Sequence, residues 1–284
     1  MPLFARQKKS ISQIIMASIL FHQIYKHADP QAPCVLFLHG AGGGTATWKK
    51  QVKDFSQKFT VILVDLPGHA QSATTCSDIS KYTFEWISEK VWEVLDHNQI
   101  KQVHIVSMSL GSVVARMMHE TRPHGVLSLI LAGPITQLSV GLRIFMKMGL
   151  MISGIIGFRN FYKLLAKIIL PKANHASSRK VFVREANALT DAEYRKWTAM
   201  YGKHLDATLI RLFSAPPIIP TYLIVGSEDH FFLAASKSFA QQFPEVKISI
   251  VERCGHLVTL EKQDIFNSLS IKFIEELEVN SKGK

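Results

Sequence analysis

The chain has 284 residues, of which 47% are hydrophobic, 10% aromatic and 19% charged. This composition excludes an intrinsically disordered chain, which would be poorer in apolar and aromatic residues. The formal net charge of +11 favours anionic partners in general. However, the sequence has no zinc-finger spacing, no RNP-like aromatic segment and no concentrated basic tract, so we expect no nucleic-acid partner.

The first segment of the chain resembles a signal peptide only in part. Basic residues precede the apolar stretch Ile11–Phe21, but polar residues interrupt it and no small-residue cleavage site follows. We expect two short strands in Ile11–Tyr25 instead, with a turn near Ala17-Ser18. The three cysteines form no C-x-x-C pair, which favours a reducing, cytoplasmic compartment.

Short apolar runs alternate along the chain with stretches of helical periodicity. This alternation predicts parallel strands joined by crossover helices, and runs that are apolar throughout indicate strands covered on both faces. Helical spacing is clear between Ile87 and Leu95 and again between Phe266 and Leu277. We therefore expect an α/β fold with a mostly parallel central sheet flanked by helices. The predicted strands are Cys34–Leu38, Thr60–Asp65, Val103–Val106, Leu127–Ala132, Tyr222–Val225 and Lys247–Val251.

One long stretch breaks the alternation. From Ile135 to Ser214 the pattern is helical, and prolines lie at both ends of the stretch. Such an insertion in an α/β sheet is interpreted as a helical lid over the carboxyl edge of the sheet, where open α/β sheets bind ligands. The predicted organisation is a core domain in two parts, residues 1–134 and 216–284, with a lid at residues 135–215.

A serine stands at a turn between a predicted strand and a predicted helix. The segment Val103–Gly111 is an apolar strand that runs into a small-x-Ser-x-Gly turn around Ser109. A sharp turn of this kind exposes the serine hydroxyl, and the following N–H lies at a helix start that favours negative charge. Ser109 is the candidate nucleophile.

A serine nucleophile needs a base, and the base needs a group that orients it. His256 follows Gly255 just after a predicted strand, which makes it the candidate base among the twelve histidines. Asp229 follows the strand Tyr222–Val225 and is the candidate acid, with its neighbour Glu228 as a rival. The chain order of serine, acid and histidine is the one found in α/β hydrolases.

A glycine-rich turn follows the first buried strand, at His39–Gly44. Glycines there let backbone N–H groups approach a substrate closely. We expect the N–H groups of Ala41 and Leu110 to form an oxyanion hole. Neither G-x-x-x-x-G-K-[ST] nor a clean G-x-G-x-x-G occurs at this turn, which argues against a nucleotide.

At this point the sequence resembles the α/β-hydrolase superfamily, in its lid-bearing esterase, lipase and C–C hydrolase branch. The resemblance rests on His39-Gly40 with Trp48, on Asp65–Ser72, on the Ser109 turn, on Gly226–Asp229 and on Gly255–Leu257. It implies a Ser-His-Asp triad, no cofactor and no metal. Two positions depart from the family pattern, since Ser107 and Ala70 stand where glycine is usual. We expect the small Ser107 to cause strain but to permit catalysis.

The resulting hypothesis is a serine hydrolase that cleaves a carboxylic ester or related acyl bond of a lipophilic small molecule through an acyl-enzyme. A C–C bond hydrolase, a lactonase or an acyltransferase using the same triad stays open, as does a non-catalytic ligand receptor. The expected substrate contacts are Gly42, Trp48, Met108, Phe145 and Met148.

The predicted lid contains an apolar run, Met148–Phe158, between Lys147 and Arg159. A bilayer span needs about 20 residues, so the run is too short to cross a membrane. With its basic flanks it fits a peripheral contact with anionic lipid, and membrane association is left open on that ground.

Overall fold

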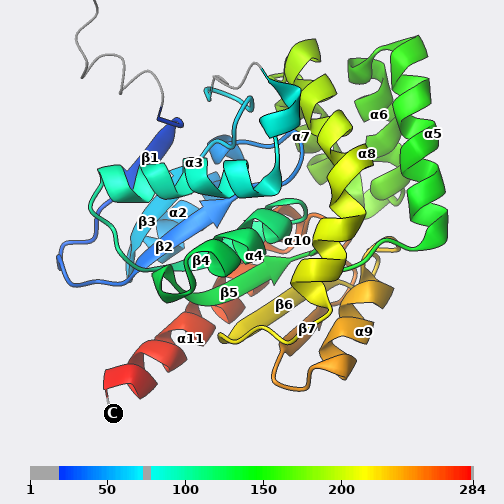
Figure 1. Ribbon diagram of the computed structural model, residues 1–284. Helices are drawn as coiled ribbons and strands as arrows, with labels where there is room; N and C mark the ends of the chain where they lie inside the picture. The colour runs from blue at the N-terminus through cyan, green and yellow to red at the C-terminus, as the bar shows by residue number, and fades with distance from the viewer. Residues whose placement is uncertain (1–18, 73–77, 283–284) are drawn as a thin grey trace, which may run out of the picture.

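The computed structural model describes residues 19–72 and 78–282. Its centre is a sheet of seven strands in the order β1-β3-β2-β4-β5-β6-β7 (Figure 1). The first strand pairs antiparallel with β3, and every other pairing is parallel. The strands are β1 (His22–Tyr25), β2 (Cys34–Leu38), β3 (Thr60–Val64), β4 (Val103–Met108), β5 (Val126–Ala132), β6 (Thr221–Gly226) and β7 (Lys247–Val251).

Helices cover both faces of the sheet because its strands are apolar on both sides. Along β2, Leu36 and Leu38 point into one hydrophobic cluster, and Val35 and Phe37 point into the other. This is the two-residue alternation of a strand, applied to a sheet buried on both faces. The first cluster lies under α3 (Phe84–His97), α4 (Gly111–Thr121) and α9 (Leu233–Gln242), and the second under α2 (Lys49–Phe55) and α11 (Gln263–Lys282).

The predicted α/β class and the predicted strands are confirmed. All six strands are present with small shifts at their ends, the largest being the extension of β4 to Met108. Of the two strands expected in Ile11–Tyr25, β1 is present and pairs with β3. The other strand and the turn at Ala17-Ser18 lie outside the described residues.

Four helices occupy the chain between β5 and β6, and we call them the helical segment. They lie together beyond one edge of the sheet (Figure 1). Gly157, with φ of +79°, separates the first two of them, so the apolar run of the sequence is divided between two helices. In the described part of the chain, no helix combines the length and the apolar character needed to cross a bilayer. The helices are α5 (Val140–Ile156), α6 (Phe158–Ile169), α7 (Ala176–Ala186) and α8 (Asp191–Phe213).

Long polar side chains anchor the helical segment to the core. The indole N–H of Trp197 in α8 donates to the carbonyl of Pro67 at 3.0 Å. The guanidinium of Arg116 in α4 donates to the carbonyl of Leu212 near the end of α8. These bonds fix α8 over α4 and over the loop that follows β3.

Candidate active site

The turn after β4 exposes the hydroxyl of Ser109. The strand ends at Met108, α4 begins at Gly111, and Ser109 between them has φ of +52°. A non-glycine residue in this left-handed region is strained, and such strain concentrates at functional sites. The turn is held by the N–H of Ser109, which donates to the carbonyl of Ala132 at 2.9 Å.

The small-x-Ser-x-Gly motif has a small residue on each side of Ser109, and only the second of them has to be glycine. A Cβ at Gly111 would lie 2.4 Å from the carbonyl oxygen of Leu38, so only glycine lets α4 pack so closely on β2. Ser107, in contrast, is a fully buried residue of β4 whose hydroxyl lies 3.5 Å from the carbonyl of Ile130. Serine is accommodated there inside a regular strand.

A chain of hydrogen bonds joins Ser109, His256 and Asp229. His256 Nε2 lies 3.0 Å from Ser109 Oγ, and His256 Nδ1 lies 2.8 Å from Asp229 Oδ2. Because a carboxylate accepts, the Nδ1–H donates to Asp229 and Nε2 is left to accept the Ser109 hydroxyl. Burial raises the pKa of Asp229, but the facing His256 and the N–H groups of Phe231 and Phe232 outweigh it, so this pKa is below its ordinary value.

Glu228, the rival acid, points elsewhere. Its carboxylate accepts from Asn174 at 2.9 Å, lies 2.8 Å from His175 Nε2 and pairs with Lys172 at 2.9 Å. Hydrogen bonds from Asn174 and Lys172 lower the pKa of Glu228 to about 2. This carboxylate therefore joins the loop before α7 to the core, whereas Asp229 meets His256.

The two N–H groups predicted to bind an oxyanion have no other partner. Among the described residues, neither the N–H of Ala41 nor that of Leu110 donates to a protein acceptor. Gly42, with φ of +72°, allows this loop to turn beneath α6, since a Cβ there would lie 3.0 Å from the ring of Tyr162.

Two buried histidines hold the glycine-rich loop His39–Gly44 in place. The N–H of Gly42 donates to His69 Nε2 at 3.1 Å, and the N–H of Leu66 donates to His39 Nε2 at 2.9 Å. Accepting at Nε2 requires the neutral ring with its proton on Nδ1, which donates to a carbonyl in each case. Burial, reinforced by His39, lowers the pKa of His69 to about 3, and burial lowers that of His39.

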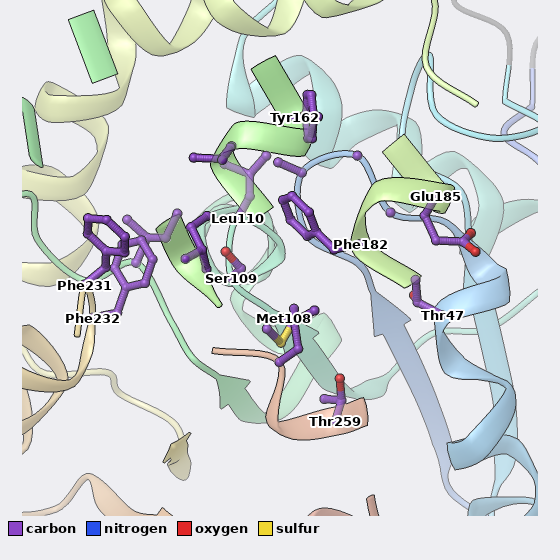
Figure 2. A pocket seen from close by; sticks show the side chains of 18 of the residues that line it. Thr47, Met108, Ser109, Leu110, Tyr162, Phe182, Glu185, Phe231, Phe232 and Thr259 are labelled. Atoms are coloured by element: carbon purple, nitrogen blue, oxygen red, sulfur yellow. The ribbon is translucent and has the colours of Figure 1, made fainter. Parts of the chain in front are cut away.

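An apolar cavity of about 190 Å³ opens above Ser109. Figure 2 shows Phe231 and Phe232 on one side of the Ser109 hydroxyl and Phe182 on the other. An adjoining cavity of about 180 Å³ lies between α5, α6 and α8. The two share the lining residues Ala41, Leu138, Phe145, Met146, Tyr162, Leu165 and Tyr201.

Four of the five predicted substrate contacts lie at this cavity. Gly42, Trp48, Met108 and Phe145 are among its lining residues. Met148 is not, because its side chain is 54% exposed on the outer side of α5. The buried side of α5 carries Leu142, Gly149 and Ser153, about 100° around the helix from Met148 at the nearest.

Several lining residues were not predicted. Phe231 and Phe232 lie two and three residues after Asp229, so their position just after the candidate acid was a usable signal. Tyr162, Phe182 and Glu185 come from α6 and α7, whose placement over the core has no local signature in the sequence. Among the described residues, no His, Cys, Asp and Glu side chains gather in a group of three that could hold a metal ion.

Comparisons with known proteins agree with this architecture. Residues 33–152 match the family model described as "alpha/beta hydrolase fold". The chain superposes on the structure of MenH from S. aureus with a TM-score of 0.77 and 20% identity, over 90% of this chain and 98% of that one. Over residues 33–152 the chain therefore matches the α/β-hydrolase family, and its whole fold is that of its solved neighbours.

The curated relatives have several different named activities, and the chain spans less than half of the length of the first of them. The chain is 32% identical over 111 residues to the dihydrolipoyllysine-residue acetyltransferase component of the acetoin cleaving system of Cupriavidus necator, a match that covers 39% of this chain and 29% of that protein. It is 24% identical over 272 residues to the 2-hydroxy-6-oxononadienedioate/2-hydroxy-6-oxononatrienedioate hydrolase of Comamonas testosteroni, covering 89% of this chain and 91% of that one.

Proposed function

We propose that this α/β hydrolase cleaves a carboxylic ester of a neutral, lipophilic acid by way of an acyl-enzyme on Ser109. The observation that carries the proposal is the hydrogen-bonded set Ser109, His256 and Asp229 at the floor of an apolar cavity. Nucleophile, base and orienting acid within hydrogen-bond reach are what acyl transfer to a serine requires.

The first half of the reaction forms the acyl-enzyme. Ser109 Oγ attacks the ester carbonyl carbon while its proton passes to His256 Nε2. The imidazolium is stabilised by Asp229, and the carbonyl oxygen becomes an oxyanion that accepts from the N–H groups of Ala41 and Leu110. His256 then gives the proton to the leaving alcohol oxygen as the C–O bond breaks.

The second half releases the acid. Water attacks the acyl carbon, and its proton passes to His256 Nε2. The tetrahedral intermediate uses the same two backbone donors and collapses with Ser109 Oγ as the leaving group, which takes the proton back from His256. Each of these roles for Ser109, Asp229, His256, Ala41 and Leu110 is part of the proposal.

The shape and chemistry of the cavity support a neutral acyl group. An apolar cavity of about 150 Å³ holds a benzene-sized ligand, so a cavity of about 190 Å³ with a second of about 180 Å³ beside it suits a ring or a chain of several carbons. Phenylalanine and methionine line such pockets without fixing one ligand shape.

The cavity above Ser109 favours esters over the carboxylate-bearing substrate named for the Comamonas relative. Glu185 is the one charged residue of its described lining, and no lysine or arginine lies there. A second carboxylate held in this cavity would be removed from water beside Glu185, with no cation in the lining to pair with, because Arg143 and Lys147 line the adjoining cavity and not this one. We therefore rank the C–C hydrolase alternative below the ester.

The helices over the cavity support the predicted lid at residues 135–215. Residues of α5, α6, α7 and α8 all contribute to the lining of the two cavities. We propose that this segment selects the acyl group and keeps bulk water from the acyl-enzyme, while the core carries out the chemistry.

The proposal is tested by hydrolysis of p-nitrophenyl esters of increasing acyl length. We expect activity that rises from acetate to chains of several carbons, and a loss of about 10⁶-fold in kcat for Ser109→Ala. Ser238→Ala, an exposed serine on α9, is the matched control and should retain full activity. Unchanged hydrolysis by Ser109→Ala would sink the proposal, because no acyl-enzyme could then form on this residue.

A further inference from the structure

An apolar stripe runs along the outer face of α5. Five of its residues are large, apolar and exposed, at 54% or more of their surface. Their spacing of four, four, three and four places all five within about 80° of the helix circumference, over a length of about 22 Å. These residues, which we call the α5 stripe, are Val140, Ile144, Met148, Met151 and Ile155.

The α5 stripe does not belong to the core. The buried residues of α5, which are Leu142, Gly149 and Ser153, lie on its other side. Single exposed apolar residues are ordinary, but a contiguous apolar face on a surface helix indicates a binding surface.

The charged residues of α5 and α6 have one sign, and Arg143 of α5 pairs with the acidic Asp206 of α8. From Ile135 to Arg184 the sequence contains nine lysines and arginines and no aspartate or glutamate. Lys147 projects at the edge of the stripe, and Arg159, Lys163 and Lys167 are exposed on the neighbouring α6. Within the described part of the chain, none of these four forms a salt bridge.

From this combination we infer that α5 and α6 dock this enzyme on the surface of an anionic phospholipid membrane, with the α5 stripe inserted among the acyl chains. An apolar helix face bordered by lysine and arginine is the pattern of an interfacial helix, and each basic residue near an anionic surface adds to binding. A second copy of the chain fits less well, since two faces of the same positive charge would repel each other.

The location of the stripe gives the docking a consequence for catalysis. The inner side of α5 supplies Phe145 and Met146 to both cavities, and Leu150 to the second one. A membrane at the outer side therefore lies one helix diameter from the acyl-binding space. This consequence depends on the proposed esterase function, whereas the docking itself does not.

The test is co-sedimentation of the full chain with vesicles of phosphatidylcholine, alone or mixed with phosphatidylglycerol. We expect binding to the mixed vesicles that weakens at high salt, and much weaker binding to phosphatidylcholine alone. Met151→Ser/Ile155→Ser should lower the partition coefficient by at least about tenfold. Lys163→Gln and Lys167→Gln, which line neither cavity, should each lower it by about fivefold.

Exposed apolar residues elsewhere provide the controls. Ile218 and Val279 are 92% and 70% exposed and lie outside α5. Ile218→Ser/Val279→Ser should bind vesicles like the native chain. All variants should hydrolyse a soluble p-nitrophenyl ester at the native rate, which shows that they are folded.

Three results would overturn the inference. The first is no binding of the native chain to mixed vesicles. The second is equal binding by Met151→Ser/Ile155→Ser and its control. The third is sedimentation of the native chain as a dimer that the double substitution dissociates, which would assign the stripe to a second copy. Vesicle binding without esterase activity would leave the docking standing and remove the proposed function, so the two fail separately.

Discussion

The loops at the carboxyl edge of the sheet and the helical segment above them are built by opposite rules. In the loops, the polar side chains of the site are buried and hydrogen-bonded to one another: Asp229 is 1% exposed and His256 is 3% exposed. On α5, large apolar side chains face outward, with Ile155 at 85% exposure. The difference fits a division of tasks between the two regions. The groups proposed to make and break bonds need fixed distances, whereas the outward apolar face of α5 fits the membrane contact inferred above.

The largest expected effect is a loss of kcat, and it tests whether Asp229, in the loop after β6, is the acid of the reaction. Asp229→Asn should lower kcat by about 10⁴-fold, because an amide no longer fixes the His256 tautomer or stabilises the imidazolium. Glu228→Gln, one residue away, should leave kcat close to native and lower the melting temperature, since Glu228 bonds to the loop before α7. Kinetics with p-nitrophenyl butyrate and thermal melts of both variants make the comparison. If Glu228→Gln lowered kcat far more than Asp229→Asn did, Glu228 would be the acid that orients His256.

The second effect concerns how the core loops respond to acid. The unfolded chain protonates His69 near pH 6.5, and the folded chain does so only near pH 3, because burial lowers this pKa. The unfolded state thus binds more protons within this window, so stability is complete above it and falls as the pH falls. For His69 alone, we expect a loss of about 2 kcal/mol between about pH 6.5 and pH 5.

Urea unfolding at a series of pH values measures this loss. His69→Gln, whose amide oxygen can still accept from Gly42, should flatten the dependence on pH. His97→Gln, at an exposed site on α3, should leave it unchanged. If the free energy of unfolding fell with pH equally in the native chain and in His69→Gln, the stability of the loop would not depend on a neutral His69.

A smaller effect should separate substrate selection from chemistry. Glu185 belongs to α7 and lines the cavity beside Phe182 and Thr47 (Figure 2). Glu185→Gln should raise kcat/KM for the p-nitrophenyl monoester of a dicarboxylic acid by about tenfold, because it removes a like charge. It should leave the neutral ester of the same length unchanged. An equal change in kcat/KM for the charged and the neutral ester would mean that Glu185 acts on folding or on the triad.

The smallest effect is at Ala70, where glycine is usual in the family pattern. Ala70 has φ of +44°, a left-handed conformation that disfavours any residue with a Cβ. Ala70→Gly should raise the free energy of unfolding by about 0.5 to 1 kcal/mol. The neighbouring Gln71→Gly is the control and should lower it, because Gln71 does not have a positive φ. A destabilised Ala70→Gly would show that this turn is not strained.

Much of the core was accessible from the sequence because its signals are local. The strands are apolar runs of a few residues, and the Ser109 turn lies between one such run and a helical pattern. Ser109, Asp229 and His256 each follow a strand, and the carboxyl ends of parallel strands meet at one edge of a sheet. Their approach was therefore predictable before any distance was known.

The sequence by itself determined the α/β class, the order of the strands along the chain, and the pairing of Ser109 with His256 and one of two neighbouring acids. Only the tertiary structure decided which of Glu228 and Asp229 faces His256, that Met148 points away from the cavity, and that α6 and α7 supply Tyr162 and Glu185 to it. The reason is physical. Hydrophobic periodicity specifies a buried side for each element, but the packing of helices against one another specifies what that side meets.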